Sequence, residues 1–253
     1  MENLVQINDP CDVKSHLNES QIISNSFQLY QGSTGFQDYG IIGHMIKKNI
    51  IDAWRHIFLK QNNDIYEVET PLITPFNVLK ASGHVDKFTD FVIYDKKGKC
   101  YRADHLVKNH PSFTGNVDEM KPYELEEYIK KNKLVDCDTD AHVVTKNLML
   151  EVDSSDNKTF LRPEIAQGIF VNMKQYLDYF SGKLPFGIAQ VGRSFRREIS
   201  PQPFVRLREF TQAEIEYVFD PENEGHKLFS DIENYIIPLF SSQDQLARNQ
   251  PKD

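Results

Sequence analysis

The chain has 253 residues, of which 40% are hydrophobic and 26% charged, and its formal net charge is −8. This composition is typical of a folded globular domain and excludes a chain that is disordered throughout. The acidic balance disfavours a protein that covers nucleic acid by bulk positive charge, but it is compatible with a local basic site.

The sequence also argues against membrane and disulfide-based classes. No stretch approaches 18 uninterrupted apolar residues, so we expect no transmembrane helix and no membrane partner. The segment after Met1 lacks the basic and apolar regions of a secretory signal. Cys11, Cys100 and Cys137 are too few and too scattered for a disulfide framework. We therefore expect a cytoplasmic protein in a reducing compartment.

The first part of the chain predicts a leader, a helix and three strands. Residues 1–25 are polar and are expected to form a loosely ordered leader. Apolar residues at helical spacing predict a helix over residues 41–59. The expected strands are 65–69, which runs into Thr70-Pro71, and 91–94 and 100–103, which a hairpin turn joins.

Residues 107–148 have a different pattern. Asparagine, glycine and proline interrupt this stretch repeatedly, and residues 124–133 form a short charged helix at best. We interpret the stretch as an insertion on the surface of the domain.

The organised pattern resumes at Thr159. Pro163 is tolerated only near a helix start, which predicts a helix over residues 165–179. The other expected elements are an apolar strand at 186–195, an alternating strand at 205–219, an amphipathic helix at 226–240 and a polar tail at 241–253. The loop between the two long strands is too short for a parallel crossover, so we expect them to be antiparallel. The fold class is therefore α+β, with an antiparallel sheet and helices packed against it.

The two long strands carry an unusual row of polar and aromatic residues. One face of the second strand holds Arg206, Arg208, Phe210, Gln212, Glu214 and Glu216, and on the first strand Arg196 and Glu198 share a face. Two interpretations are open. A charged strand is by default a solvated face with cross-strand ion pairs. The order from basic through aromatic to acidic instead suits a site for a nucleotide and an amine, because guanidinium groups bind phosphate, aromatic faces stack on bases and carboxylates hold ammonium groups.

The segments around these strands resemble one enzyme family. Phe195-Arg196-Arg197-Glu198, a short loop and Arg206-Leu207-Arg208-Glu209-Phe210 resemble motif 2 of class II aminoacyl-tRNA synthetases. The segments that resemble glycyl-tRNA synthetases of the dimeric eukaryotic and archaeal type are Ser82 to Phe88, Tyr101 to Leu106, Leu161 to Phe170 and Arg208 to Glu216. The resemblance runs from about Phe27 to Pro221 in the correct order, and it is poor at 107–148.

This resemblance implies a six-stranded antiparallel sheet flanked by helices, in a partial catalytic domain over residues 26–240. The early helix and the strand that ends at Pro71 would be motif 1, which builds the dimer interface in this class. An ordinary core helix and strand fits the same pattern equally well. The full-length family forms homodimers, and we expect this chain alone to dimerise weakly or not at all.

The resemblance also implies a two-step reaction. The carboxylate of glycine attacks the α-phosphate of ATP to form glycyl-adenylate, and the glycyl group then passes to tRNA(Gly). Such catalysis consists mostly of positioning and charge neutralisation. The implied catalytic residues are Arg196, at the α-phosphate, and Glu198, which binds the adenine amino side or orients the substrate. The implied ATP-binding residues are Arg196, Arg197, Glu198, Arg206, Leu207 and Phe210.

The resemblance also implies a role for each ATP-binding residue. Arg206 would reach the terminal phosphates, Phe210 would stack on adenine, and Arg197 and Leu207 would contribute main-chain contacts. Mg²⁺ would bridge the phosphates. No spacing of cysteine or histidine indicates a metal site of the protein's own.

Glycine has no side chain to grip. Selectivity must therefore come from binding its ammonium group and from filling the space that a methyl group would need. The resemblance places Glu164 and Glu214 at the ammonium group, with Glu216 as a weaker candidate. In isolation, Glu164 is well explained as an acid that favours a helix N-terminus. His84 and His105 lie in the resembling segments, but elementary physics assigns neither a role.

Motif 3 of the class, a Gly-rich strand and helix with an arginine for the γ-phosphate, has no counterpart. After Gly192 the sequence has one more glycine, Gly225, and after Arg208 one more arginine, Arg248. We therefore expect the N-terminal part of a catalytic domain, incomplete at its C-terminal end and without the anticodon-binding domain. Two functions stay open: a glycine–tRNA ligase present as a fragment, and a truncated synthetase-like paralogue that acts as a non-catalytic binding or regulatory protein.

Overall fold

The computed structural model describes residues 10–138, 140–153, 158–222, 229–241 and 243–244. The chain divides into two compact units, residues 1–217 and 218–253, and each is described by itself. In the described part of the chain, no helix is long and apolar enough to cross a membrane.

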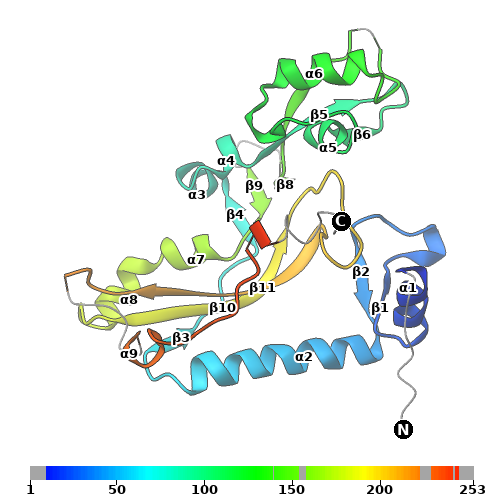
Figure 1. Ribbon diagram of the computed structural model, residues 1–253. Coiled ribbons are helices and arrows are strands. Elements are labelled where there is room, and N and C mark those ends of the chain that lie inside the picture. The colour runs from blue at the N-terminus through cyan, green and yellow to red at the C-terminus, as the bar shows by residue number, and fades with distance from the viewer. Residues whose placement is uncertain (1–9, 139, 154–157, 223–228, 242, 245–253) are drawn as a thin grey trace. The chain divides into compact units, whose positions relative to one another are not determined.

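The first unit holds most of the regular structure (Figure 1). Its α-helices are α1 (Pro10–Glu19), α2 (Ile41–Arg55), α3 (Phe76–Ala81), α4 (His84–Lys87), α5 (Ala103–Lys108), α6 (Pro122–Lys131), α7 (Ala166–Phe170) and α8 (Met173–Tyr179). Its other helical turns are η1 (Gln28–Tyr30), the π-helix η2 (His56–Lys60) and η3 (Val117–Glu119). Its strands are β1 (Ile23–Asn25), β2 (Gln37–Tyr39), β3 (Ile65–Glu67), β4 (Ile73–Pro75), β5 (Thr89–Tyr94), β6 (Cys100–Arg102), β7 (Val144–Asn147), β8 (Leu150–Asp153), β9 (Thr159–Leu161), β10 (Phe186–Phe195) and β11 (Glu209–Val218), the last of which ends one residue into the second unit.

The sheet that carries the predicted chemistry has the strand order β11-β10-β3. β10 coincides with the predicted strand at 186–195, and Figure 1 shows β10 and β11 running in opposite directions, as expected. The implied six-stranded antiparallel sheet is wrong for the described residues, because this sheet has three strands and β3 pairs with β10 in parallel, with Ile65 opposite Gly187. The chain between β3 and β10 is long enough for the crossover that a parallel pair requires.

Helix α2 and the π-helix η2 confirm the helix predicted over residues 41–59. Figure 1 shows α2 running alongside the β11-β10-β3 sheet. The helix contacts the sheet through Lys47, whose Nζ donates a hydrogen bond to Thr211 Oγ1 at 2.6 Å. Much of the apolar face of the helix stays exposed; its exposed members are Ile42, Met45, Ile46, Ile50, Ile57 and Phe58.

Residues 10–25 are more ordered than the loose leader that the sequence predicts. They form α1 and β1, and β1 pairs antiparallel with β2. The segment at Ile22 passes close to the start of α2, and a Cβ atom at Gly43 would lie 1.7 Å from the carbonyl oxygen of Ile22. The backbone N–H of Gly43 donates to Gln21 O at 3.2 Å, so the glycine in α2 is what permits this crossing.

A second sheet, of order β4-β9-β8, is antiparallel throughout and covers a small core with α3. The helix predicted over residues 165–179 is divided into α7 and α8. At the division Asn172 has φ −99° and ψ 1°, and its side chain donates to Gly168 O at 2.9 Å. An asparagine side chain that bonds the preceding turn competes with the helix hydrogen bonds, which accounts for the break.

The stretch 107–148 is packed rather than a mainly irregular surface segment. It completes a third sheet, β6-β5-β7, which packs with α5 and α6 around a core of its own. That core consists of Ile93, Ala103, Val107, Val117, Leu125 and Ile129, none more than 8% exposed. Leu125 and Ile129 are the buried residues of α6, one turn apart, so the apolar stripe of this charged helix is narrow and easily missed. The interpretation of the stretch as an insertion stays a prediction.

The strand predicted over residues 205–219 begins later, at Glu209. Before it the chain forms a loop closed by an isolated bridge between Gln202 and Arg206, and Phe204 turns this loop with φ 66°. Arg206 and Arg208 therefore precede the strand instead of lying in its side-chain alternation, because the turn interrupts the extended backbone.

The second unit contains α9 (Phe229–Ile232) among its described residues. The helix predicted over 226–240 is wrong beyond the turn that follows α9, because residues 235–240 have no regular structure. Ile236 and Leu239 are strongly exposed, so the apolar pattern has no described surface to bury against. Residues 226–228 and most of the tail at 241–253 lie outside the described residues.

Candidate functional site

Arg196 follows the end of β10 and is held on several sides. Its backbone N–H donates to Arg208 O at 2.9 Å, and its side-chain Nε donates to Pro163 O at 3.1 Å. Its guanidinium carbon lies 5.3 Å from the centroid of the Phe88 ring and 5.1 Å from that of Phe210. Among the described residues, no hydrogen bond occupies its two Nη groups. This arrangement presents a fixed positive charge with donors left for an outside anion.

Glu198 is buried and already paired. Its side chain is about 4% exposed, and Arg206 Nε lies 2.8 Å from its Oε2. Arg208 Nε donates to the carbonyl oxygen of Glu198 at 3.1 Å, which fixes the loop that carries Arg206. Removing the guanidinium alone would leave a buried carboxylate uncompensated, so a ligand that draws Arg206 away must itself donate to Glu198.

Two of the predicted ATP contacts lie apart from these groups. The side chain of Arg197 is exposed, and its backbone N–H donates to Leu148 O at 2.6 Å. Leu207 lines a cavity on the side of α2. The prediction for both residues concerns their main-chain atoms, which the positions of the side chains do not test.

Three glutamates gather where the chain enters α7 and along β11. Gln167 Nε2 donates to Glu164 Oε1 at 2.6 Å, and Gln212 Nε2 donates to Glu214 Oε1 at 2.7 Å. Burial, and then the charges of Glu164 and Glu216, raise the pKa of Glu214, while Arg196 and Arg162 oppose the rise. Burial and Glu164 likewise raise the pKa of Glu216. The cluster is therefore a place where negative charge is poorly compensated and a cation would bind favourably.

Arg162 is a buried member of the site that sequence reasoning passed over. It is 5% exposed, its Nε donates to Arg193 O at 2.7 Å, and its Nη1 donates to Thr70 O at 3.0 Å. Burial lowers the pKa of Arg162, and the charges of Glu69 and Glu214 act against that lowering. A Cβ atom at Gly192 would lie 2.2 Å from Arg162 Nη2. The glycine inside an otherwise apolar strand was the available signal, because such a glycine often marks the close approach of another group.

A second charged group, which acts electrostatically on the Glu198–Arg206 pair, was also missed. Arg102 donates to both carboxylate oxygens of Asp104 and lies 3.4 Å from Asp90 Oδ2. Burial raises the pKa of Asp90, and the charges of Asp104 and Glu198 raise it further, while Arg102 and Arg206 lower it. The β6-β5-β7 sheet and the start of α5 therefore bring ion pairs of their own within electrostatic reach of Glu198.

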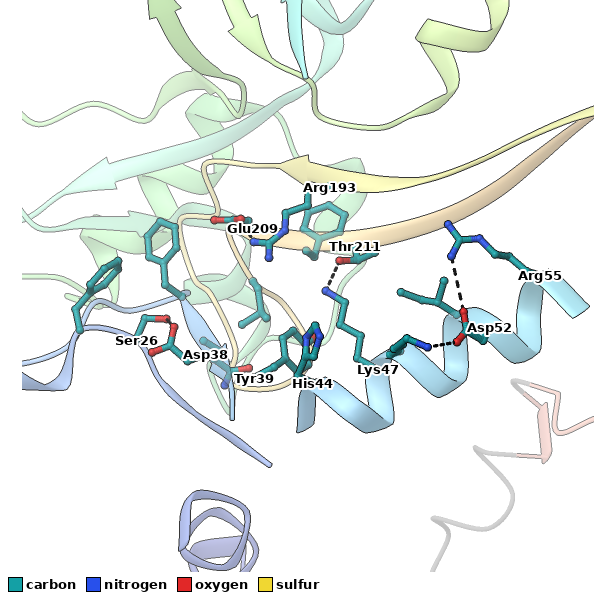
Figure 2. Close-up of a pocket in the computed structure, with 17 residues that line it drawn as sticks. Ser26, Asp38, Tyr39, His44, Lys47, Asp52, Arg55, Arg193, Glu209 and Thr211 are labelled. Atoms are coloured by element: carbon teal, nitrogen blue, oxygen red, sulfur yellow. Dashed lines mark hydrogen bonds and ion pairs between the residues drawn. The ribbon is translucent and has the colours of Figure 1, made fainter. Parts of the chain in front are cut away.

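Two cavities bear on the site. One of about 120 Å³ is lined by Arg162, Glu164 and Gln167 together with residues of β4, α3 and α7. Another of about 700 Å³ lies between α2 and β11, where Lys47 bonds Thr211 and Arg193 pairs with Glu209 (Figure 2).

The 700 Å³ cavity has a lining of mixed charge, with Asp52 and Glu209 as well as Lys47 and Arg193. Burial lowers the pKa of Lys47, and the charge of Arg193 lowers it further. Of the predicted site residues, Leu207 and Phe210 line this cavity and the others do not, so it adjoins the predicted site through Phe210.

The geometry thus brings Arg196, Phe210, Glu164 and Glu214 together and leaves the side chain of Arg197 outside. Arg196 bonds the carbonyl oxygen of Pro163, the residue before Glu164, and its charge acts on Glu214. Among the residues that the structure describes, no group of three or more histidine, cysteine, aspartate or glutamate side chains could hold a metal ion.

The curated proteins that the chain matches in sequence share one name, glycine–tRNA ligase. No family model matches the chain. The chain is 40% identical over 237 residues to glycine–tRNA ligase of Methanocaldococcus jannaschii, an alignment that covers 90% of this chain and 41% of that protein. It is 42% identical over 230 residues to glycine–tRNA ligase of Pyrococcus horikoshii, covering 87% and 40%.

Among solved structures, prolyl-tRNA synthetase from Cryptosporidium parvum complexed with L-proline and AMP matches with a TM-score of 0.47 at 14% identity, over 83% of this chain and 30% of that one. The chain spans about two fifths of the length of the curated relatives it matches. Over about nine tenths of its own length, the chain is similar in sequence to glycine–tRNA ligases.

Proposed function

We propose that the chain carries the glycine-activation site of a glycine–tRNA ligase, where glycine and ATP form glycyl-adenylate before the glycyl group is transferred to tRNA(Gly). One fixed guanidinium group beside three carboxylates carries this proposal. Glycine is short, so a group that binds its ammonium and a group that binds the reacting phosphate must lie close together. Arg196 and Glu214 meet that requirement, since the charge of Arg196 acts on the carboxylate of Glu214.

The ammonium group of glycine would bind among Glu164, Glu214 and Glu216. Burial and mutual repulsion raise the pKa of Glu214 and of Glu216, and an ammonium ion would relieve both effects by favouring the ionised carboxylates. The buried Oε2 of Glu214 has no hydrogen-bond partner within the described ranges, so an acceptor is available for the ligand.

ATP would bind along Arg196, Phe210 and the loop before β11. Arg196 would neutralise the charge that develops at the α-phosphate, and Phe210 would stack on adenine. Arg206 would leave Glu198 for the terminal phosphates, which frees the Glu198 carboxylate to accept from the adenine amino group. Main-chain groups of Arg197 and Leu207 would complete the contacts. Mg²⁺ would enter with ATP and bind the phosphate oxygens, the ligands that this ion prefers.

The wider assignment rests on the similarity to glycine–tRNA ligases. We propose residues 26–240 as part of a class II catalytic domain, tRNA(Gly) as the second substrate and a homodimer as the state of the longer proteins. We place the reaction in the cytoplasm, because three scattered cysteines suit a reducing compartment. No feature in the described part of the chain favours the alternative of a non-catalytic regulatory protein.

Glycine-dependent exchange of pyrophosphate into ATP tests the proposal on the purified chain. Exchange is expected with glycine and not with alanine, and Arg196→Ala should abolish it. Arg193→Ala is the matched control, because that side chain is exposed, lies on β10 shortly before Arg196 and pairs with Glu209 beside the other cavity. ATP binding without exchange would contradict autonomous catalysis, and the absence of both would overturn the proposed function.

A further inference from the structure

His84 connects the start of α4 to the glutamate cluster. Its Nδ1 lies 2.8 Å from Ser82 Oγ, and its Nε2 lies 3.5 Å from Glu164 Oε1. Gly83, with φ +83°, reverses the chain between Ser82 and His84 so that the two side chains can meet. The imidazole side chain is 14% exposed, so its contacts are largely sheltered from water.

The direction of the hydrogen bonds follows from the two neighbours of the ring. If Ser82 Oγ donates to Nδ1, the ring carries its proton on Nε2 and presents it to Glu164 Oε1. In the other neutral tautomer, a lone pair on Nε2 would face a carboxylate oxygen, which is repulsive. The first arrangement is therefore the one in which Nε2 donates to Glu164, and in it the Ser82 hydroxyl donates to Nδ1 at 2.8 Å rather than to Leu79 O, which lies 3.2 Å away.

The backbone of His84 is also held from outside α4. Asn147 Nδ2 donates to His84 O at 3.1 Å and to Val85 O at 3.0 Å. The imidazole ring packs edge-on against Phe88 with centroids 5.5 Å apart. These contacts restrict the ring, and the 3.5 Å separation between Nε2 and Glu164 Oε1 is one that can tighten when substrate binds, as catalytic contacts in ligand-free sites often do.

Glu164 needs such support because its neighbours repel it. Its carboxylate acts on Glu214 and Glu216, and Gln167 Nε2 donates to the same oxygen, Oε1, that His84 Nε2 approaches. A lysine or arginine in place of His84 would neutralise Glu164 and compete with a ligand ammonium group. A neutral N–H donor orients the carboxylate and leaves its charge available.

We propose that His84, held by Ser82 as the Nε2–H tautomer, is a positioning residue that orients Glu164 toward the ammonium group of the substrate. This inference rests on the proposed function of the glutamate cluster. It gives His84 a part in amino-acid binding that neither its sequence context nor its chemistry alone assigned.

Two stable ligands separate the amino-acid contacts from the nucleotide contacts. Glycyl-sulfamoyl-adenosine is a non-reactive copy of glycyl-adenylate, and sulfamoyl-adenosine lacks the glycyl group. The ratio of their dissociation constants, measured by calorimetry on the full chain, reports the contribution of the ammonium site. The wild-type chain is expected to bind the glycyl compound more tightly.

His84→Ala is expected to reduce this ratio roughly tenfold, the effect of losing one hydrogen bond to a charged group, and to leave the affinity for sulfamoyl-adenosine unchanged. His84→Gln, whose amide nitrogen can replace Nε2, is expected to restore most of the ratio. His84→Asn, whose amide nitrogen replaces Nδ1 instead, is expected not to restore it. Because Gln and Asn carry the same amide, they control for folding, which thermal melts check.

The outcomes are distinguishable. A folded His84→Ala chain that keeps the wild-type ratio, or equal ratios for the Gln and Asn variants, would overturn the role of His84 and leave the proposed function intact. A wild-type chain that binds both compounds equally would overturn the proposed function of the glutamate cluster and this inference with it.

Discussion

Ionisation of Glu214 lowers the stability of the ligand-free fold but favours the binding of an ammonium ligand. Because burial and the neighbouring carboxylates raise its pKa, the folded state holds more protons than the unfolded state between the ordinary glutamate pKa and the raised value. The free energy of unfolding of the ligand-free chain therefore falls as the pH rises through that interval, and it levels off above it. An ammonium ligand reverses this cost by favouring the ionised form.

Glu214→Gln is accordingly expected to raise the melting temperature at neutral pH and to weaken the preference for glycyl-sulfamoyl-adenosine. For a chain of this size, each kcal/mol gained raises the melting temperature by roughly 2–4 °C. Melting curves from pH 4 to pH 8 measure the first effect, and calorimetry measures the second. Glu127→Gln, which neutralises an exposed acid on α6, is the control. A variant that melts at or below the wild-type temperature at neutral pH would show that Glu214 is not strained by its neighbours.

At the scale of elements, β10 was predictable because apolar residues dominate its first half and Pro185 directly precedes it. The start of β11 was not, because Arg206 and Arg208 continue the alternation of a strand while the turn at Phe204 interrupts the backbone. The helix at 226–240 failed for a related reason. Periodicity describes which residues could share a face, and only a packing partner decides whether that face forms a helix.

Gly192 in β10 leaves the space that the Arg162 side chain occupies. An added methyl group at this position would lie 2.2 Å from Arg162 Nη2, and Arg162 is buried and bonded to two backbone carbonyls. Gly192→Ala is therefore expected to cost about 1–3 kcal/mol, the usual range for overpacking, visible as a lower urea midpoint. Gly115→Ala is the control, since its methyl group would meet the ring of Phe113, a side chain that can move. Equal midpoints for the two variants would contradict the fixed position of Arg162.

At the scale of the whole molecule, the residues of the candidate site were more predictable than their surroundings. Arg196, Phe210 and Glu214 could be identified because motif spacing along the chain is local information. Arg162 and Arg102 could not, because their partners, Thr70 and Asp90, are separated from them in sequence or lie on a different strand. The packed core within 89–147 was hidden for the same reason, since its buried residues are spread over several short elements.

The exposed apolar face of α2 is the surface through which the chain could self-associate. Ile42, Ile46 and Ile50 lie about one turn apart and are all exposed, so two copies could pair through this helix. One helix face is small against the roughly 1,200–2,000 Å² that stable interfaces bury, and association itself costs about 4–15 kcal/mol. We therefore expect sedimentation equilibrium to show a monomer at about 1 μM, with at most weak self-association above it. Ile46→Glu should abolish that association, because pairing would place a charge against an apolar surface. A tight dimer at 1 μM that survives Ile46→Glu would show that another surface holds the copies together.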